Sequence, residues 1–356
     1  MKKIGRQVMF IETSDNNPRN GEGAFIKLND GSILFGFTEF IGLTREDEEN
    51  ARISAIKSYD EGESWSERFV LFEKPIGSVN IMSLSFLRMK NGDIGAFYIV
   101  KHTDGTDKIV FCRSADEGKT WTEPISCMDC LDVQDYFVLN NDRVIMLDNG
   151  RILFAVARHT IHGGYEDFAP GVICFFASDD DGNSWYKTES ELPCPFKKNP
   201  DGYEEPGLFV LPGGRIWCYI RTSIGFQFES FSDDNGITWT FPEPNINISS
   251  ACSPMLIKNC GNHTVAVFNP IPEHILRKDS EPWGRTPYVL ASSSDGGLTF
   301  TKDKLFYLEN DLNNGYCYPA IFSGDDYFLV AYYHSDGTDN CLNCAKIIKI
   351  RNEEID

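Results

Sequence analysis

Apolar segments alternate with short polar turns along the whole chain, and the alternation recurs as a unit. Six times an apolar run meets a glycine turn and continues as a second apolar run, with the turn glycines at positions 31, 92, 150, 214, 261 and 324. The intervals between them are 61, 58, 64, 47 and 63 residues. Asn-Gly and Asp-Gly dipeptides between apolar runs are strong hairpin signals. The pattern therefore predicts six β-hairpins and almost no helix.

A second repeat follows each of the first five hairpins. It reads Ser-x-Asp-x-Gly-x-Ser/Thr-aromatic, and its five copies begin at Ser58, Ser114, Ser178, Ser232 and Ser293. Asp and Ser side chains bind nearby backbone N–H groups, and the glycine supplies the positive φ of a tight reversal. An apolar run precedes every copy, so we expect each box to cap a third strand. We expect the boxes to be structural, because they fall on the same side of the fold as the hairpin turns.

The two repeats together predict the architecture. One hairpin, one box-bearing strand and one further strand make a four-stranded sheet, and six such sheets around an axis make a β-propeller. We predict an all-β, six-bladed propeller of four-stranded antiparallel blades, forming one domain over residues 1–356. The sixth blade lacks a box, so we expect the strand around Gln7–Glu12 to join it and close the ring. Two packed β-sandwiches would fit six similar units poorly.

Charge narrows the range of partners. The chain has 33 Lys+Arg against 53 Asp+Glu, a formal charge of −20. This argues against nucleic acid and against an anionic membrane surface as partners. No apolar stretch reaches the roughly 18 residues of a membrane span. The N-terminus shows no signal-peptide pattern, so we expect a cytoplasmic protein, the alternative being a secreted protein expressed without its signal. The oligomeric state stays open.

Cysteine usage and short motifs add little to the functional picture. The count of eleven cysteines is odd, which favours free thiols in a reducing compartment. Two pairs have CxxC spacing, and we favour two unrelated loops over a four-thiolate zinc site. Acidic runs at Glu46–Asn50 and Ser335–Asn340 fit solvated loops better than calcium sites. The chain has no P-loop and no dinucleotide fingerprint, so we expect no metal and no cofactor. The two cysteine pairs are Cys127/Cys130 and Cys341/Cys344.

The candidate functional side chains, which are arginines, carboxylates and tyrosines, lie where the blades converge. The starts of the first strands and the ends of the second strands meet near the axis, on the face opposite the hairpin turns. Several arginines around one pocket imply an anionic ligand held by bidentate contacts. A tyrosine beside a glutamate gives a nucleophile with an adjacent base, and a carboxylic acid can protonate a leaving oxygen. These are the parts of glycoside hydrolysis. The candidate residues are Arg19, Glu22, Asp47, Arg143, His159, Glu205, Arg221, Arg285, Tyr316 and Tyr318.

With its five Asp-box (BNR) repeats on six predicted blades, the sequence resembles the sialidase (neuraminidase) superfamily over essentially its whole length. The resemblance implies a tyrosine nucleophile with a glutamate partner, three arginines that clamp the substrate carboxylate, and an aspartate as general acid/base. Glu205, Arg221, Arg285 and Tyr318 (or Tyr316) follow the family's order along the chain.

The first half of the chain departs from the family's pattern. It has no Arg-Ile-Pro motif, and its nearest arginine is Arg19. The resemblance gives Asp47 as the general acid, with Glu46 and Glu48 as competitors. Arg143 and His159 are expected to bind substrate without a clear counterpart in the family's pattern, and Glu22 and Tyr316 are expected to bind substrate as well.

Three functions remain open from the sequence. The leading one is a retaining exo-glycosidase that removes a terminal sialic acid or a related acidic sugar from a glycan. The second is a polysaccharide lyase or hydrolase acting on a uronate, with His159 or Tyr318 as base and Arg143 or Arg221 neutralising the carboxylate. The third is a propeller that binds an acidic glycan without turnover.

Overall fold

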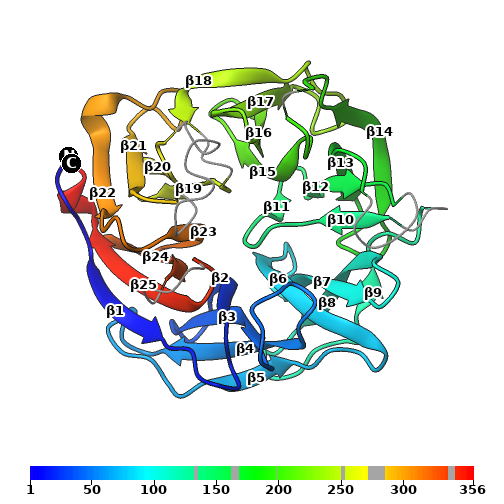
Figure 1. Cartoon of the computed structure of the whole chain (residues 1–356), viewed down its shortest axis with the longest axis horizontal. Helices are drawn as coiled ribbons and strands as arrows, with labels where there is room; N and C mark the ends of the chain where they lie inside the picture. Colours follow the sequence, from blue (N-terminus) through cyan, green and yellow to red (C-terminus); the bar gives the residue numbers. More distant parts are fainter. Residues whose placement is uncertain (132–134, 162–167, 198, 250–252, 272–284, 336–340) are drawn as a thin grey trace.

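Six antiparallel sheets surround a common axis in the computed structural model, which describes residues 1–131, 135–161, 168–197, 199–249, 253–271, 285–335 and 341–356 (Figure 1). The sheets are the blades of a propeller, which confirms the predicted all-β fold. In the described ranges, helix is limited to two 3-10 turns, Lys302–Lys304 and Asn352–Glu354. Neither of them has the length or apolar character to cross a membrane.

Four blades have the predicted order, with each strand paired to the next along the chain. The first contains β2 (Asn20–Lys27), β3 (Ile33–Phe40), β4 (Ala51–Ser58) and β5 (Phe69–Phe72), and the second β6 (Ser78–Arg88), β7 (Ile94–His102), β8 (Asp107–Ser114) and β9 (Ile125–Ser126). The fourth contains β15 (Glu204–Val210), β16 (Ile216–Arg221), β17 (Phe226–Ser232) and β18 (Glu243–Ser249), and the fifth β19 (Leu256–Cys260), β20 (His263–Phe268), β21 (Tyr288–Ser293) and β22 (Leu305–Glu309).

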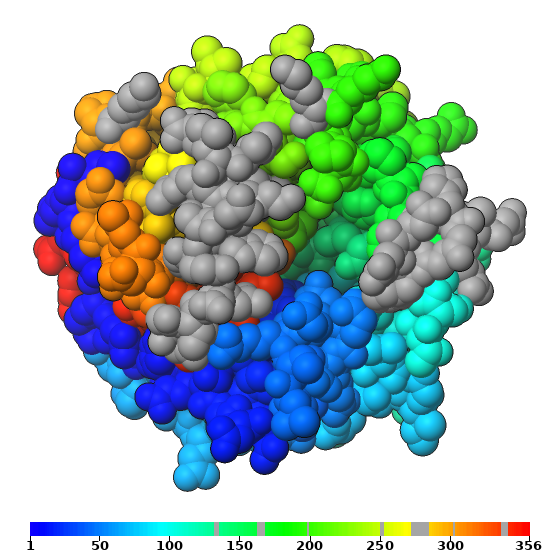
Figure 2. All heavy atoms as spheres, viewed as in Figure 1, coloured from blue at the N-terminus to red at the C-terminus, as the bar shows by residue number. Residues whose placement is uncertain are grey.

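The third and sixth blades differ from this order. In the third, the inner position is shared by β10 (Tyr136–Val138) and β11 (Ile145–Met146), which both pair with β12 (Ile152–His159); β13 (Val172–Ser178) and β14 (Tyr186–Pro193) follow. The sixth contains β23 (Tyr316–Ser323), β24 (Tyr327–His334) and β25 (Cys344–Arg351). Its fourth strand is β1 (Arg6–Ile11), which pairs antiparallel with β25. In Figure 2 the colours accordingly run around the ring from blue to red and meet.

Each Asp box folds into the same hydrogen-bonded turn. In the first, the Ser58 hydroxyl accepts the Gly62 N–H at 2.8 Å, and the Asp60 carboxylate accepts the Ser64 N–H at 2.8 Å. The other four boxes repeat both bonds. The sequence predicts a positive φ only at the glycine of each box. The residue directly before that glycine also has a positive φ, as Glu61 does before Gly62. Two consecutive left-handed residues are needed to reverse the chain.

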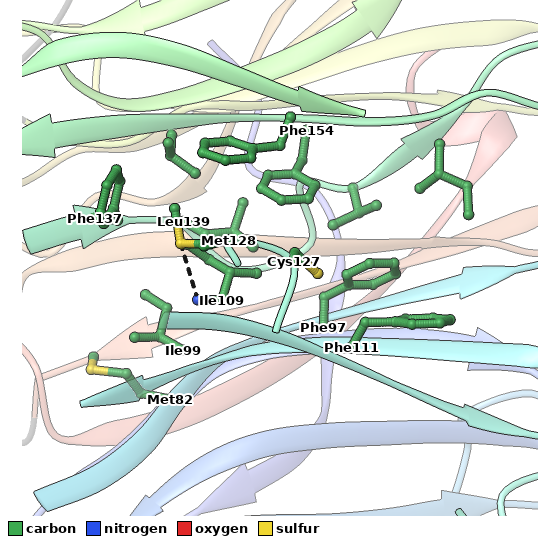
Figure 3. Packing of buried hydrophobic residues seen from close by; sticks show 14 of the residues in the cluster. Met82, Phe97, Ile99, Ile109, Phe111, Cys127, Met128, Phe137, Leu139 and Phe154 are labelled. Atoms are coloured by element: carbon green, nitrogen blue, oxygen red, sulfur yellow. Dashed lines mark hydrogen bonds between the residues drawn. The ribbon is translucent and has the colours of Figure 1, made fainter. Parts of the chain in front are cut away.

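The box aromatics pack between blades. Trp121 of the second box contacts Phe72 of the first blade at a centroid distance of 5.0 Å. Trp239 of the fourth box stacks on Phe175 of the third blade at 4.1 Å. The core is thus a set of clusters at the seams between blades, and Figure 3 shows the cluster between the second and third, where Phe97 faces Phe154 at 6.3 Å. Each box therefore fixes its own blade to the preceding one.

Acid should weaken all five boxes together. Hydrogen bonds from Ser and Thr hydroxyls and backbone N–H groups lower the pKa of the Asp116 carboxyl to about 2, and the pKa of the other four box aspartates also falls below the usual value. A group with a depressed folded-state pKa stabilises the fold above its unfolded pKa, and this contribution is lost as pH falls through the folded pKa. We expect the Tm to fall between about pH 4 and pH 2, measured by circular dichroism. Asp116→Asn should lower the Tm at pH 7 and reduce its fall over that interval; an unchanged fall would show that other groups cause it.

A short segment between β10 and β11 reaches the propeller axis (Figure 1), and its hydrogen bonds link it to five other blades. The Asn141 amide donates to Gly23 O in the first blade at 2.7 Å and to Pro319 O in the sixth at 3.2 Å. The Asp142 N–H donates to Leu84 O of the second blade at 3.0 Å. Three further bonds link the segment to the fourth, fifth and sixth blades: Arg143 Nη1 to Tyr219 Oη at 2.6 Å, Lys258 Nζ to Asp142 at 2.8 Å, and Ile321 N to Asp142 at 3.1 Å. We call residues 140–143 the axial segment.

Candidate active site

A cavity of about 550 Å³ lies where the predicted strand starts and ends converge. Its walls come from all blades except the second, including the loop between β3 and β4, the ends of β12 and β16, and the start of β15. The sequence-predicted residues in its lining are Arg19, Asp47, His159, Glu205, Arg221, Arg285 and Tyr318. Glu22 lies deeper, in an adjoining cavity of about 70 Å³ that Arg19, Asp47, Glu205 and Tyr318 also line.

Bulges in the inner strands aim these side chains. The pairing register shifts between Gly21 and Ala24 in β2, and equivalent shifts occur in β6, β15 and β23. A residue with a positive φ occupies each shift: Glu22, Ser83, Glu205 and Tyr318. A bulge adds one residue to a strand and redirects its side chains, and non-glycine residues keep such φ values only where the surroundings enforce them. Four blades therefore use one backbone device to turn a polar side chain toward the axis.

A tyrosine, a glutamate and an arginine form a chain of hydrogen bonds in the cavity. The Tyr318 hydroxyl donates to Glu205 Oε1 at 2.5 Å, and Arg221 Nη1 donates to Glu205 Oε2 at 2.5 Å. Arg221 Nε also lies 3.1 Å from Glu204. Burial and the negative charge of Glu205 raise the pKa of the Tyr318 phenol. The phenol is thus neutral in the resting site, with a carboxylate oxygen placed to take its proton.

Two further arginines line the cavity, and both are buried. Arg19 donates to Glu22 at 2.5 Å, to Asp47 at 2.5 Å and to the Tyr333 hydroxyl at 2.8 Å. The Arg285 guanidinium lies 5.7 Å from the centre of the Tyr318 ring. Three guanidinium groups therefore line the cavity that holds Tyr318, an arrangement that suits an anionic ligand.

Asp47 lies at the rim of the cavity, with 46% of its side chain exposed. Burial acts to raise its pKa, but the charges of Arg19 and Lys101 outweigh burial and hold the pKa below its usual value. Its competitors are placed differently. Glu46 lines the same cavity, whereas Glu48 accepts a hydrogen bond from Lys101 Nζ at 2.8 Å.

Two predicted residues lie away from the cavity. Arg143 belongs to the axial segment, where its guanidinium binds the Tyr219 hydroxyl below the site, because the left-handed residue Asp142 turns the chain at this point. Tyr316 is fully buried among aromatic rings, 5.1 Å from that of His334. Arg143 and Tyr316 therefore do not line the cavity in this structure, and Tyr318 is the candidate nucleophile.

His159 does reach the cavity, but as a neutral ring. Its Nδ1 lies 3.1 Å from Ala169 O, and burial lowers its pKa. It can therefore offer a hydrogen bond to a ligand, although near pH 7 it adds no positive charge to the three arginines.

Sequence reasoning missed several lining residues. Tyr136 lines both cavities from β10, which the hairpin pattern left out because the axial segment separates it from β11; the apolar run at residues 136–139 is the signal that could have found it. Asp201 and Leu342 come from loops without periodicity. The sequence marks Cys341 only as half of a CxxC pair, yet the residue lines the cavity. In the described ranges, no group of three or more His, Cys, Asp or Glu residues could hold a metal.

Comparison with known proteins agrees with this architecture. The model of the BNR repeat-like domain matches residues 40–330. No curated protein matches the chain in sequence. Similar solved structures include a leech intramolecular trans-sialidase in complex with 2,7-anhydro-Neu5Ac, with a TM-score of 0.76, 14% identity and coverage of 100% of this chain and 71% of that one. The intramolecular trans-sialidase of Ruminococcus gnavus, in complex with oseltamivir carboxylate, gives a TM-score of 0.74 and 12% identity over 99% and 98% of the two chains.

A third similar structure is a protein of unknown function from Dyadobacter fermentans, with a TM-score of 0.72 and 18% identity over 97% of this chain and 99% of that one. At such identities, the likeness shows the fold alone. The activity has to be argued from the cavity and its side chains.

Proposed function

The chain belongs to the family of BNR repeat-like domains, and on that premise we propose that it is a sialidase-like retaining exo-glycosidase that removes a terminal sialic acid or a related acidic sugar from a glycan. One observation carries the proposal: the Tyr318 hydroxyl donates to Glu205 at 2.5 Å inside a cavity that Arg19, Arg221 and Arg285 also line.

The arginines account for the choice of an acidic sugar. Guanidinium groups bind carboxylates through two parallel hydrogen bonds, and they are favoured where that geometry decides recognition. A carboxylate entering the cavity meets Arg19 and Arg285 in its wall, with Arg285 beside the Tyr318 ring. A neutral sugar would leave these buried charges without the anion that their arrangement suits.

Tyr318 and Glu205 supply the nucleophile. As the phenol oxygen attacks the anomeric carbon, its proton passes to Glu205, which already accepts that hydrogen bond. Arg221 keeps the other carboxylate oxygen in position at 2.5 Å. A neutral phenol also approaches an anionic sugar with less repulsion than a carboxylate would.

Asp47 is the proposed general acid. In the resting site its ion pair with Arg19 keeps the carboxyl ionised. A substrate carboxylate that binds Arg19 competes for the same guanidinium, and the loss of the Arg19 contact raises the pKa of Asp47. The acid is thus protonated more readily when substrate is present to receive its proton.

Release of 4-methylumbelliferone from its sialic acid glycoside tests the proposal, with the glucuronide of the same fluorophore as the matched substrate. We expect the sialoside to be turned over. Mass spectrometry of the released sugar should then identify either free or anhydro sialic acid. Turnover of the glucuronide alone would identify a uronate, instead of sialic acid, as the substrate.

Two other outcomes would change the class of function. An unsaturated product that absorbs in the ultraviolet from a uronate polymer would indicate a lyase. Saturable binding of sialic acid in calorimetry, without release of fluorophore from either glycoside, would indicate a glycan-binding propeller.

A further inference from the structure

Two cysteines of the sixth blade lie against each other at the cavity. The sulfurs of Cys317, in β23, and Cys341, just before β25, are 3.9 Å apart. Cys341 lines the cavity, although only 1% of its surface is exposed, and Cys317 lies behind it. All ten cysteines that the structure describes are free thiols, so this pair is reduced. The proposed glycoside chemistry uses neither sulfur.

The two sulfurs share the guanidinium of Arg285. Its Nη1 lies 3.3 Å from Cys317 Sγ and 3.5 Å from Cys341 Sγ. A cation beside a thiol favours the thiolate, which is the reactive form. The hydrogen bond from Cys317 and the charge of Arg285 lower the pKa of Cys341, whereas burial raises the pKa of Cys317. Of the two sulfurs, Cys341 is therefore the one on which Arg285 favours the thiolate.

We propose that Cys341 is a site of reversible oxidation by small hydroperoxides, with Cys317 as the thiol that closes the oxidised sulfur into a disulfide. The proposal stands on the contact between the two sulfurs, on their shared arginine and on the position of Cys341 in the cavity wall. The oxidation itself does not depend on the proposed glycosidase activity.

The chemistry balances in two steps. The Cys341 thiolate attacks one oxygen of the hydroperoxide: an S–O bond forms, the O–O bond breaks, and the leaving oxygen takes a proton to become water or an alcohol. Cys317 then loses its proton and attacks the sulfenic sulfur. An S–S bond forms, the S–O bond breaks, and the hydroxide leaves as water. Two thiols lose two electrons in total, and one hydroperoxide is reduced.

Formation of the disulfide would change the cavity at two residues, Tyr318 and Arg285. Closing the bond brings the sulfurs from 3.9 Å to about 2.05 Å, which moves Cys317 and with it the adjacent Tyr318. It also removes the thiolate beside Arg285. We therefore expect oxidation to lower sialoside turnover, and this consequence, unlike the oxidation, rests on the proposed function.

Peptide mapping under non-reducing conditions tests the oxidation on the wild-type protein. After brief treatment with hydrogen peroxide at pH 7, we expect a cross-linked peptide pair containing Cys317 and Cys341 that dithiothreitol separates. Cys130, an exposed thiol in the second-blade region, serves as the internal control for unselective oxidation. Because Cys341 is so little exposed, tert-butyl hydroperoxide should form the cross-link more slowly than hydrogen peroxide.

Two variants separate the roles of the sulfurs. In the Cys317→Ser variant, oxidation should stop at a sulfenic acid on Cys341, which dimedone traps. The Cys341→Ser variant should give neither the cross-link nor a dimedone adduct on Cys317. The proposal is overturned if hydrogen peroxide oxidises Cys130 in the wild type before any Cys317–Cys341 cross-link forms, a result that needs neither variant to fold.

The effect of oxidation on sialoside turnover is measured in a separate experiment. A cross-link that forms without any change in sialoside turnover would overturn the link to Arg285 and Tyr318, but not the oxidation site. If the reduced protein does not turn over sialosides at all, the proposed function fails, and the peptide map still decides the oxidation.

Discussion

Tyr318→Phe is expected to abolish turnover of the sialoside while ligand binding survives. The substitution removes only the hydroxyl that donates to Glu205 and keeps the ring beside Arg285. Loss of a nucleophile lowers kcat by about 10³-fold or more. The Glu205 carboxylate loses one donor but keeps Arg221, so the free energy of unfolding should fall by only about 1–3 kcal/mol. Fluorogenic kinetics, calorimetric binding of sialic acid and thermal unfolding measure the three effects.

Tyr316→Phe is the matched control for this experiment. Tyr316 lies two positions away in the same strand but packs among buried rings outside the cavity. We expect its removal to leave kcat close to that of the wild type. Full activity in Tyr318→Phe would refute the nucleophile assignment, and loss of activity in Tyr316→Phe alone would move it to that residue.

Asp47→Asn is expected to separate substrates by their leaving groups. General acid catalysis contributes about 10²–10⁴-fold, and it matters most when the leaving oxygen is basic. An asparagine cannot protonate the alkyl leaving group of sialyllactose, so kcat/KM for that substrate should fall by about that factor. The 4-methylumbelliferyl glycoside, with an acidic phenol as its leaving group, should lose much less. Both rates are read from the sugar released.

Glu46→Gln addresses the competing assignment, because Glu46 lines the same cavity without contacting Arg19 in the way that Asp47 does. The leaving-group difference should be absent in this variant. If it appears there and not in Asp47→Asn, Glu46 is the acid. Equal losses on both substrates in Asp47→Asn would instead assign Asp47 a role in holding Arg19.

The propeller could be predicted because its evidence is local and repeated. Each hairpin turn and each Asp box is encoded in eight to fifteen neighbouring residues, and the repeats recur at similar intervals. Even so, the short strand β10 was missed, since the axial segment interrupts the pattern on which the prediction relied.

The site was predicted less completely, because its geometry depends on bulges that the sequence does not mark. In a regular strand Tyr316 and Tyr318 would point to the same face, so the sequence could not choose between them. The register shift between Cys317 and Ala320 and the positive φ of Tyr318 turn the two rings apart. Likewise, Arg143 stands at a strand start that the repeat places near the axis, but its orientation depends on Asp142.

The axial segment has a consequence for how ligands are selected. Because residues 140–143 tie five blades together at the centre, the inner strands cannot separate one at a time to admit a larger sugar. Most of the cavity wall is therefore preorganised, and little conformational entropy is left to lose there on binding. The exposed loop that carries Glu46 and Asp47 is joined to this wall from outside. Ligand preference can accordingly be re-engineered in that loop without redesigning the propeller.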